Sequence, residues 1–221
     1  MTHPISPYHQ PGFYTDALAR GRHRDIVGGR WDETGRAQMA LLLAEGLQPH
    51  HHLLDIGAGS LRLGCKAVPY LLPGHYWATD LSGALMARGH AVELPDPARL
   101  TPAHLVEDAD FGFPGIPDHI SHAIAFAVFT HLPLSHLEHA LTRIHARFPR
   151  LERLLFTVFL CPPDHSGALR QPDGVVSHPN RAPYHFTPAA VLDLTHATGF
   201  DAQFVTTRLP RGQTLCLARH L

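Results

Sequence analysis

The sequence has 221 residues, of which 44% are hydrophobic and 17% are charged, and its formal net charge at pH 7 is −1. This length suits a single domain, and the apolar content excludes an intrinsically disordered chain. The nearly balanced charge argues against nucleic acid as the main partner, because proteins that bind a polyanion usually carry a basic excess.

The cysteines and the apolar segments indicate a cytoplasmic protein. Cys65, Cys161 and Cys216 are widely spaced and form no CxxC pair, as expected of a reduced chain without disulfides. The first residues lack the apolar segment of a signal peptide. The longest purely apolar run, Ala123–Phe129, is too short to span a bilayer, so we expect no membrane partner.

The sequence contains twenty histidines, which raises the question of a metal site. HxxH spacing occurs at His119/His122, beside an expected strand, and at His136/His139, on an expected helix, and a run covers His50–His52. An offset of three faces opposite sides of a strand, whereas it shares one face of a helix. No cysteine or carboxylate accompanies either pair, so we predict no metal site.

Helical and strand-like patterns alternate along the chain. Ser135 and Glu138 have the S-x-x-E spacing of a capping box, and Thr187-Pro188 has the residues that favour a helix start. The expected elements, in chain order, are an arm at 1–12, a helix at 13–22, a helix at Asp32–Leu47, a strand at Leu53–Ile56, a helix at Leu61–Leu72 weakened by Pro69, a strand at His75–Asp80, a helix at Ser82–Gly89, strands at Leu105–Glu107 and Ile120–Val128, a helix from Ser135 to Phe148, a strand at Leu154–Leu160, a long loop at 161–186, a helix from Thr187 to Gly199, and a hairpin of Asp201–Thr207 and Thr214–Arg219.

This alternation predicts an α/β domain with a doubly wound, mainly parallel sheet of seven strands, helices on both faces and an antiparallel C-terminal hairpin. We expect one domain over residues 1–221. Residues 1–31 would form an N-terminal arm or lid, and residues 161–186 a lid-like loop, because long loops in compact domains are usually functional or disordered. Residues 13–31 and 161–186 would form the two lips of a pocket.

Chemically suggestive residues follow the expected strands, where the ligand site of an open α/β sheet lies. The first strand runs into the glycine turn Asp55–Gly59, which lets a ligand approach the backbone closely. Asp80 closes the second strand and could either accept hydrogen bonds from both ribose hydroxyls of an adenosine or cap the next helix near Ser82. After the third strand, Asp108 and Asp110 are alternative acceptors for an adenine amino group.

These features resemble a class I S-adenosylmethionine (SAM) dependent methyltransferase over about residues 25–221. The resemblance rests on the motif Asp55-x-Gly57-x-Gly59, on the acid that closes the second strand, and on the segment AVFTHLP after the fourth strand. Three segments match recurrent features of a group of small bacterial methyltransferases whose substrates are mostly unassigned. These segments are VGGRWDETG at 27–35, LLDIGAGSLRLG at 53–64 and PRGQTLCLA at 210–218. The resemblance implies a Rossmann-like methyltransferase fold, SAM as cofactor, and methyl transfer to oxygen or nitrogen of a small-molecule acceptor.

The resemblance also implies cofactor contacts. Asp55 would anchor the methionine amine directly or through water, unless it serves as a helix cap. Arg62, one turn into the next helix, either reaches the SAM carboxylate or lies exposed. The remaining implied contacts are Gly57, Ala58 and Gly59 beneath the methionine and ribose, Asp80 on the ribose, Leu81 beside the adenine, Asp108 and Ala109 at the adenine edge, and Phe126 near the sulfonium.

A catalytic base and acceptor-binding residues are harder to identify. His131 follows the fourth strand near the expected methyl position, where it could accept a proton or pack against the sheet. Tyr184 and His185, beside the long loop, and Tyr14 and Trp31, in the N-terminal segment, are candidates for contact with the acceptor.

Two other interpretations remain open at this point. A nicotinamide dehydrogenase also uses a glycine-rich turn, but Arg62 replaces the third glycine of its fingerprint and no second nucleotide-binding half follows. A SAM-binding protein without transferase activity, or one that needs a partner, would share the cofactor residues. Oligomeric state is undetermined, with a homodimer as one option.

Overall fold

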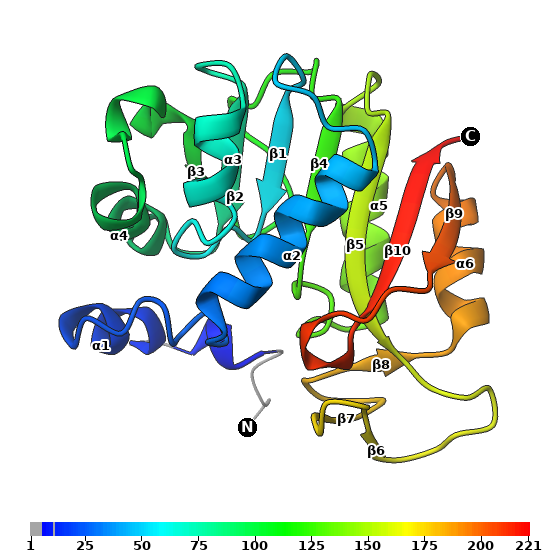
Figure 1. Cartoon of the computed structure of the whole chain (residues 1–221). Helices are drawn as coiled ribbons and strands as arrows, with labels where there is room; N and C mark the ends of the chain where they lie inside the picture. The colour runs from blue at the N-terminus through cyan, green and yellow to red at the C-terminus, as the bar shows by residue number, and fades with distance from the viewer. Residues whose placement is uncertain (1–5, 11) are drawn as a thin grey trace.

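A computed structural model describes residues 6–10 and 12–221, so part of the predicted arm lies outside the described residues (Figure 1). The helices are α1 (Phe13–Ala19), α2 (Trp31–Ala44), α3 (Gly64–Tyr70), α4 (Gly83–Glu93), α5 (Leu134–Arg147) and α6 (Pro188–Ala197), with short 3-10 turns η1 (Pro7–His9), η2 (Pro97–Arg99), η3 (Pro102–His104) and η4 (Pro210–Gly212). The strands are β1 (Leu53–Ile56), β2 (Tyr76–Asp80), β3 (Leu105–Glu107), β4 (His122–Ala125), β5 (Arg153–Leu160), β6 (Leu169–Arg170), β7 (Val176–Ser177), β8 (His185–Phe186), β9 (Phe200–Val205) and β10 (Thr214–His220).

The main sheet has the strand order β3-β2-β1-β4-β5-β10-β9. The first five strands of this order are parallel, while β10 runs antiparallel to both β5 and β9. All seven predicted strands are therefore confirmed, and the two-residue strand β8 adds to the far end of β5. The hairpin of β9 and β10 fills the edge of the sheet beside β5, where a dinucleotide-binding fold would continue with a second parallel half.

Apolar side chains cover both faces of the sheet, as a doubly wound fold requires. Leu53 of β1 packs with residues of α2, α3 and α4, whereas its neighbour Leu54 packs with residues of α5 and α6. On β5, Leu155 packs on the same face of the sheet as Leu53, and Leu154 on the same face as Leu54. Successive side chains of a strand point to opposite faces. In Figure 1, α2 crosses in front of the sheet and α5 lies behind it.

Local geometry corrects two predicted helix starts. The helix expected from Leu61 begins at Gly64, because Leu61 has φ +62° and belongs to the turn that leaves β1. The capping box is wrong: Pro133 precedes the first turn of α5, and Ser135 lies inside the helix. The start of α6 is as predicted, since the Thr187 side chain accepts a hydrogen bond from the Ala190 N–H at 3.2 Å.

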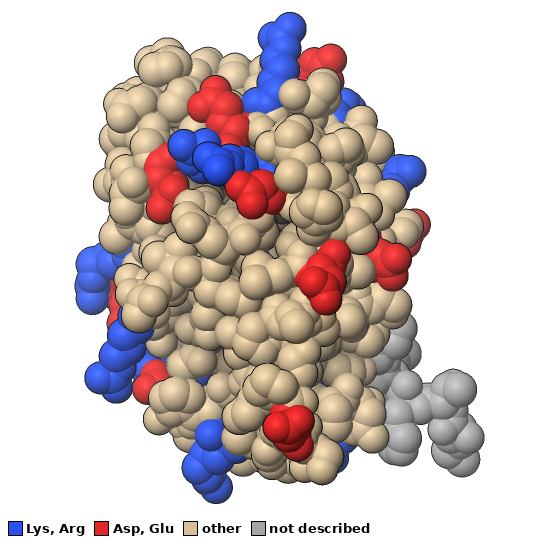
Figure 2. Space-filling view, turned by 90° about the vertical axis from the view of Figure 1, so that its right-hand side faces the viewer, with Lys and Arg blue, Asp and Glu red and all other residues tan. Residues whose placement is uncertain are grey.

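Charged side chains are scattered over the face of the molecule that Figure 2 shows. On the face shown in Figure 2, acidic and basic side chains stand singly or in small groups of mixed sign, with a large neutral area between them. No helix in residues 6–10 and 12–221 combines the length and apolarity needed to cross a membrane.

Candidate active site

A cavity of about 330 Å³ opens at the carboxyl edge of the sheet. This volume falls at the lower end of the range typical of small-molecule sites. The loops after β1, β2, β3 and β4, the N-terminal segment and the β9–β10 loop all contribute to its wall. Ten of the predicted site residues line it: Tyr14, Gly57, Gly59, Arg62, Asp80, Leu81, Asp108, Ala109, Phe126 and His131.

The glycine turn after β1 needs its two glycines for conformation and for space. Gly57 and Gly59 have φ +71° and +57°, which side chains rarely adopt. A Cβ on Gly57 would lie 2.5 Å from Val128 Cγ2, and one on Gly59 would lie 2.5 Å from Val27 Cγ1. The intervening Ala58 is buried, and its N–H donates to the Thr79 carbonyl at 3.0 Å, so this predicted contact lies outside the cavity lining.

Asp80 sits where β2 ends and connects the turn to the next helix. Its carboxylate accepts hydrogen bonds from the Gly59 N–H at 2.8 Å and the Ser82 N–H at 3.0 Å. Burial raises the pKa of Asp80 to about 6, although both N–H groups favour its ionised form. The N-terminus of α4 is capped by the Ser82 side chain, which accepts a hydrogen bond from the Leu85 N–H. Asp80 therefore does not serve as the helix cap.

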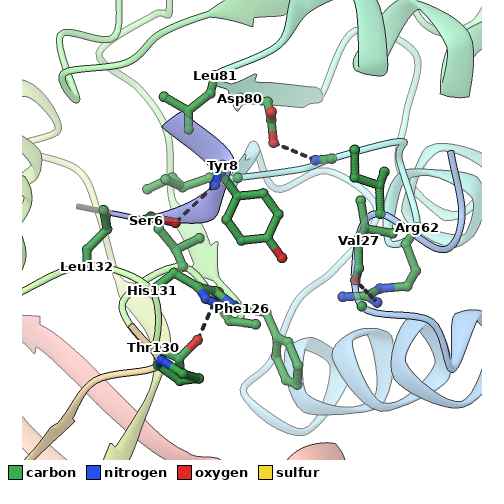
Figure 3. A pocket seen from close by; sticks show the side chains of 18 of the residues that line it. Ser6, Tyr8, Val27, Arg62, Asp80, Leu81, Phe126, Thr130, His131 and Leu132 are labelled. Atoms are coloured by element: carbon green, nitrogen blue, oxygen red, sulfur yellow. Dashed lines mark hydrogen bonds between the residues drawn. The ribbon is translucent and has the colours of Figure 1, made fainter. Parts of the chain in front are cut away.

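Arg62 is buried, which rules out the exposed alternative. Its guanidinium donates to the carbonyls of Val27 at 2.9 Å and Gly29 at 3.3 Å, while its Nε has no hydrogen-bond partner in the described part of the chain (Figure 3). Burial lowers the pKa of Arg62 to about 10, so the group is a cation at neutral pH. A buried guanidinium with N–H groups to spare is suited to an anionic ligand.

Asp55 lies behind the turn and outside the cavity lining. The Tyr76 hydroxyl donates to its carboxylate at 2.7 Å. Burial raises the pKa of Asp55 to about 7, against the opposing effects of the Tyr76 hydrogen bond and the Arg62 charge. The geometry therefore does not favour direct contact between Asp55 and a ligand in this cavity.

Asp108 and Asp110 lie in different positions relative to the cavity. Asp108 lines the cavity, and its two oxygens accept from the N–H groups of Asp110, Gly112 and Phe113 at 2.8–3.1 Å. Asp110 is exposed and pairs with His139 at 3.2 Å. Asp108 thus shapes the loop that presents Ala109 to the cavity.

His131 and two tyrosines lie together on the side of the cavity formed by the N-terminal segment. The ring of Tyr8 meets the ring of His131 edge to face, with centroids 4.9 Å apart (Figure 3). Burial lowers the pKa of His131 to about 4, so its imidazole is neutral at pH 7. Burial also raises the pKa of Tyr8 and Tyr14, which keeps both hydroxyls protonated.

Three predicted acceptor residues are placed elsewhere. Trp31 begins α2 and packs beneath the Arg24 guanidinium, which lies 5.1 Å from its ring centroid. Tyr184 and His185 are 7% and 4% exposed, and the His185 Nδ1 lies 2.9 Å from the Ser177 hydroxyl. None of the three lines the cavity, because each is used in packing its own segment.

The histidine pairs do not converge. His136 lines the cavity, whereas His139 pairs with Asp110 outside it. His122 stacks on His51 with centroids 4.5 Å apart, while His119 meets a different ring. Within the described residues, no group of three or more histidine, cysteine or acidic side chains is placed to hold a metal ion.

Several lining residues were not predicted as site residues: Tyr8, Val27, Gly28, Phe111, Phe159, Arg211 and Gln213. Four of them lie in the matched segments 27–35 and 210–218, which was the available signal. These segments meet in space, since the Arg62 guanidinium donates to Val27 and the Arg211 guanidinium donates to Gly28. Tyr8 carried no such signal.

Comparison with known proteins identifies the fold. No protein-family model and no curated protein match the sequence. The magnesium protoporphyrin IX methyltransferase from Synechocystis PCC 6803, solved with bound SAM, is 15% identical with a TM-score of 0.62, covering 100% of this chain and 99% of that chain. The 1,6-didemethyltoxoflavin-N1-methyltransferase from Burkholderia thailandensis, with bound 1,6-didemethyltoxoflavin and S-adenosylhomocysteine (SAH), is 21% identical with a TM-score of 0.58, covering 100% and 93%.

A third structure agrees with these two. The TehB-like SAM-dependent methyltransferase from Corynebacterium glutamicum ATCC 13032 is 15% identical with a TM-score of 0.60, covering 96% of this chain and 100% of that chain. The predicted resemblance is confirmed at the level of fold: the chain has the Rossmann-like fold of class I SAM-dependent methyltransferases.

Proposed function

We propose that this chain is a SAM-dependent methyltransferase that transfers a methyl group to oxygen or nitrogen of a small-molecule acceptor. One observation carries the proposal: the glycine turn after β1, Asp80 at the end of β2 and Ala109 after β3 line a single cavity at the carboxyl edge of the sheet. The fold shared with methyltransferases that contain SAM or SAH supports the same conclusion.

The lining residues fit the polar groups of SAM. Arg62 offers the unpartnered Nε–H to the methionine carboxylate, as a charge-assisted hydrogen bond. Asp80 accepts from the ribose hydroxyls, and the Ala109 segment faces the adenine edge with Leu81 beside it. Gly57 and Gly59 leave room beneath the methionine and ribose, and Phe126 lies near the reacting sulfur.

Asp55 acts from behind the turn in this proposal. Its carboxyl group lies outside the cavity lining, so it reaches the methionine amine through water, and it positions the turn by accepting a hydrogen bond from the Tyr76 hydroxyl. Ala58 has a similar role, because its N–H fixes the turn to Thr79.

When bound, SAM supplies a methyl carbon on a positively charged sulfur. The contribution of the chain is to align the acceptor with that carbon, for which effective molarity can provide roughly 7–11 kcal/mol. His131 accepts the proton that a hydroxyl or ammonium acceptor must lose, a step worth about 10²–10⁴-fold. Burial keeps this imidazole neutral, so a ring nitrogen is available, while its pKa of about 4 makes it a weak base.

Residues 13–31 and 161–186 act as the two lips of the site. Tyr14 and Val27 line the cavity from the first segment, and Val175 and Pro183 line it from the second. Both lips belong to one methyltransferase domain over residues 1–221. A cytoplasmic location is a further prediction of the sequence, and a homodimer is one option for the oligomeric state.

Methyl transfer can be tested with SAM labelled on the methyl group. The purified chain is incubated with labelled SAM and a small-molecule metabolite extract, with the Asp80→Ala variant as the matched control for contaminating activity. Label in a small-molecule product, absent with D80A, is the expected result. SAM binding without any labelled product would instead favour a SAM-binding protein that needs a partner.

A further inference from the structure

We infer that the methyl acceptor carries a carboxylate and that the Arg211 guanidinium binds it. The inference rests on the proposed function and adds the chemical class of the substrate. It depends on how the charged groups of the cavity are partnered.

The carboxylates of the cavity have partners, whereas its guanidinium groups have N–H donors to spare. Asp80 accepts two backbone N–H groups and Asp108 accepts three. Arg62 and Arg211 are the two arginines among the described lining residues, and neither forms an ion pair within the described chain. Each guanidinium donates instead to backbone carbonyls of residues 27–29.

Arg211 is held by its backbone so that its side chain lies at the cavity. Its N–H donates to the Asp173 carboxylate at 2.9 Å, and its φ of +69° is unusual for a residue with a side chain. Asp173 is already engaged by the side chains of Arg30 and Arg208, at 3.1 and 3.5 Å. The Arg211 backbone is therefore fixed, while its guanidinium has no carboxylate partner among the described residues.

The two arginines lie at different depths. Arg62 is 9% exposed and follows the glycine turn, where the cofactor is proposed to bind. Arg211 is exposed and lies on the β9–β10 loop, and β10 is on the opposite side of β1 from β2 and β3, whose ends are assigned to the ribose and the adenine. The buried Arg62 is sufficient for the single carboxylate of SAM, so we assign Arg211 to an anion on the other reactant.

A carboxylate matches this site better than a phosphate. The acceptor side offers one guanidinium and no lysine among the described lining residues, and one unit charge balances it. The remaining wall contains Phe159 and Tyr14, which favour an apolar or aromatic body. Benzoate is therefore a suitable probe, and benzamide is its uncharged counterpart of the same shape.

The experiment measures both probes by calorimetry on protein saturated with SAH. We expect benzoate to bind about tenfold more tightly than benzamide, the effect of one hydrogen bond to a charged group. Arg211→Gln should reduce this ratio to about one. Arg219→Gln should leave it unchanged, because Arg219 is exposed on β10, pairs with Asp201 and does not line the cavity.

The ratio separates recognition from a purely structural role. If Arg211 only fixes the Gly28 carbonyl, R211Q should weaken both probes equally and preserve the ratio, which would overturn the inference. Equal affinities in the unmodified protein, or no binding of benzoate, would also overturn it. Failure of SAH itself to bind would overturn the proposed function, and the inference with it.

Discussion

The Arg62 guanidinium donates a 2.9 Å hydrogen bond to the carbonyl oxygen of Val27, 35 residues earlier in the chain. This contact joins the segment after the glycine turn to the segment that precedes α2. Val27 also covers Gly59, since its Cγ1 would lie only 2.5 Å from a Cβ at that position. Arg62 therefore has two roles in the account: it closes the N-terminal wall and offers its remaining N–H groups to the cofactor carboxylate.

Replacing Arg62 should weaken cofactor binding. We expect Arg62→Gln to raise the dissociation constant of SAH at least about tenfold, because a hydrogen bond to a charged group contributes roughly 1.5–3 kcal/mol. Calorimetry measures this, with Arg88→Gln as the control, since Arg88 is exposed on α4. An unchanged affinity in R62Q would contradict the assignment of Arg62 to the carboxylate.

Replacing Asp80 should have a similar effect through the ribose. Asp80→Asn exchanges a carboxylate oxygen for an NH₂ donor, so it cannot accept from both hydroxyls, and we expect at least about a tenfold loss of SAH affinity. Asp110→Asn is the matched control, because Asp110 follows β3 but faces His139 outside the cavity. Equal losses of SAH affinity in D80N and D110N would contradict the assignment of Asp80 to the ribose.

Asp55 should make the free energy of unfolding fall as pH rises, because burial raises its pKa in the native state. Its native pKa of about 7 lies above the value of about 3.9 for an unfolded chain, so its contribution to the free energy of unfolding falls as pH rises from 4 to 7. Asp55→Asn removes this titration. The stability of D55N relative to the unmodified protein should thus rise by on the order of 2 kcal/mol between pH 5 and pH 8.

Urea denaturation at the two pH values measures the difference. The control is Asp193→Asn, which removes an exposed carboxyl of α6 and should show no comparable trend. A D55N stability difference that stays constant between pH 5 and pH 8 would mean that native Asp55 is ionised well below pH 7, and it would contradict this prediction.

Gly89 should be intolerant of a methyl group although it lies inside a helix. Alanine is normally more favourable than glycine there by about 0.5–1 kcal/mol. In α4, a Cβ on Gly89 would clash with the backbone carbonyl of Ser60, which cannot move without disturbing the turn after β1. We expect Gly89→Ala to destabilise the fold by about 1–3 kcal/mol, measured by thermal unfolding. A raised melting temperature would contradict this packing.

The two proposed lips should become protected when the cofactor binds. Trypsin has exposed sites at Arg20 and Arg22 in the first segment and at Arg170 and Arg181 in the second. We expect SAH to slow cleavage at these sites and to leave cleavage at exposed Arg150, outside both lips, unchanged. Equal cleavage rates with and without SAH would contradict closure of the lips.

The sequence was sufficient to predict the sheet and the residues near the strand ends. β1 and β4 are buried on both faces, so their short apolar runs stand out, and the acid at the end of β2 marks one carboxyl end. The position of a strand end fixes the position of the next residue, which is why Gly57, Asp80 and Ala109 were found at the cavity.

Contacts that depend on long-range packing could not be predicted. Trp31 and His185 are large polar-aromatic residues in segments that do contribute to the cavity, yet each turns toward its own neighbours. Conversely, Tyr8 reaches the cavity only because the N-terminal segment folds back over the sheet, and no periodicity marks that path. The capping box predicted at Ser135 is wrong because α5 begins at Leu134, directly after Pro133, which places Ser135 inside the helix.

Calorimetric titration with SAM tests the central claim most directly. The account predicts saturable binding of one SAM per chain, lost or weakened at least about tenfold in both R62Q and D80N, and no comparable binding of NAD. Absence of SAM binding to the folded, unmodified protein, or tighter binding of NAD than of SAM, would contradict it.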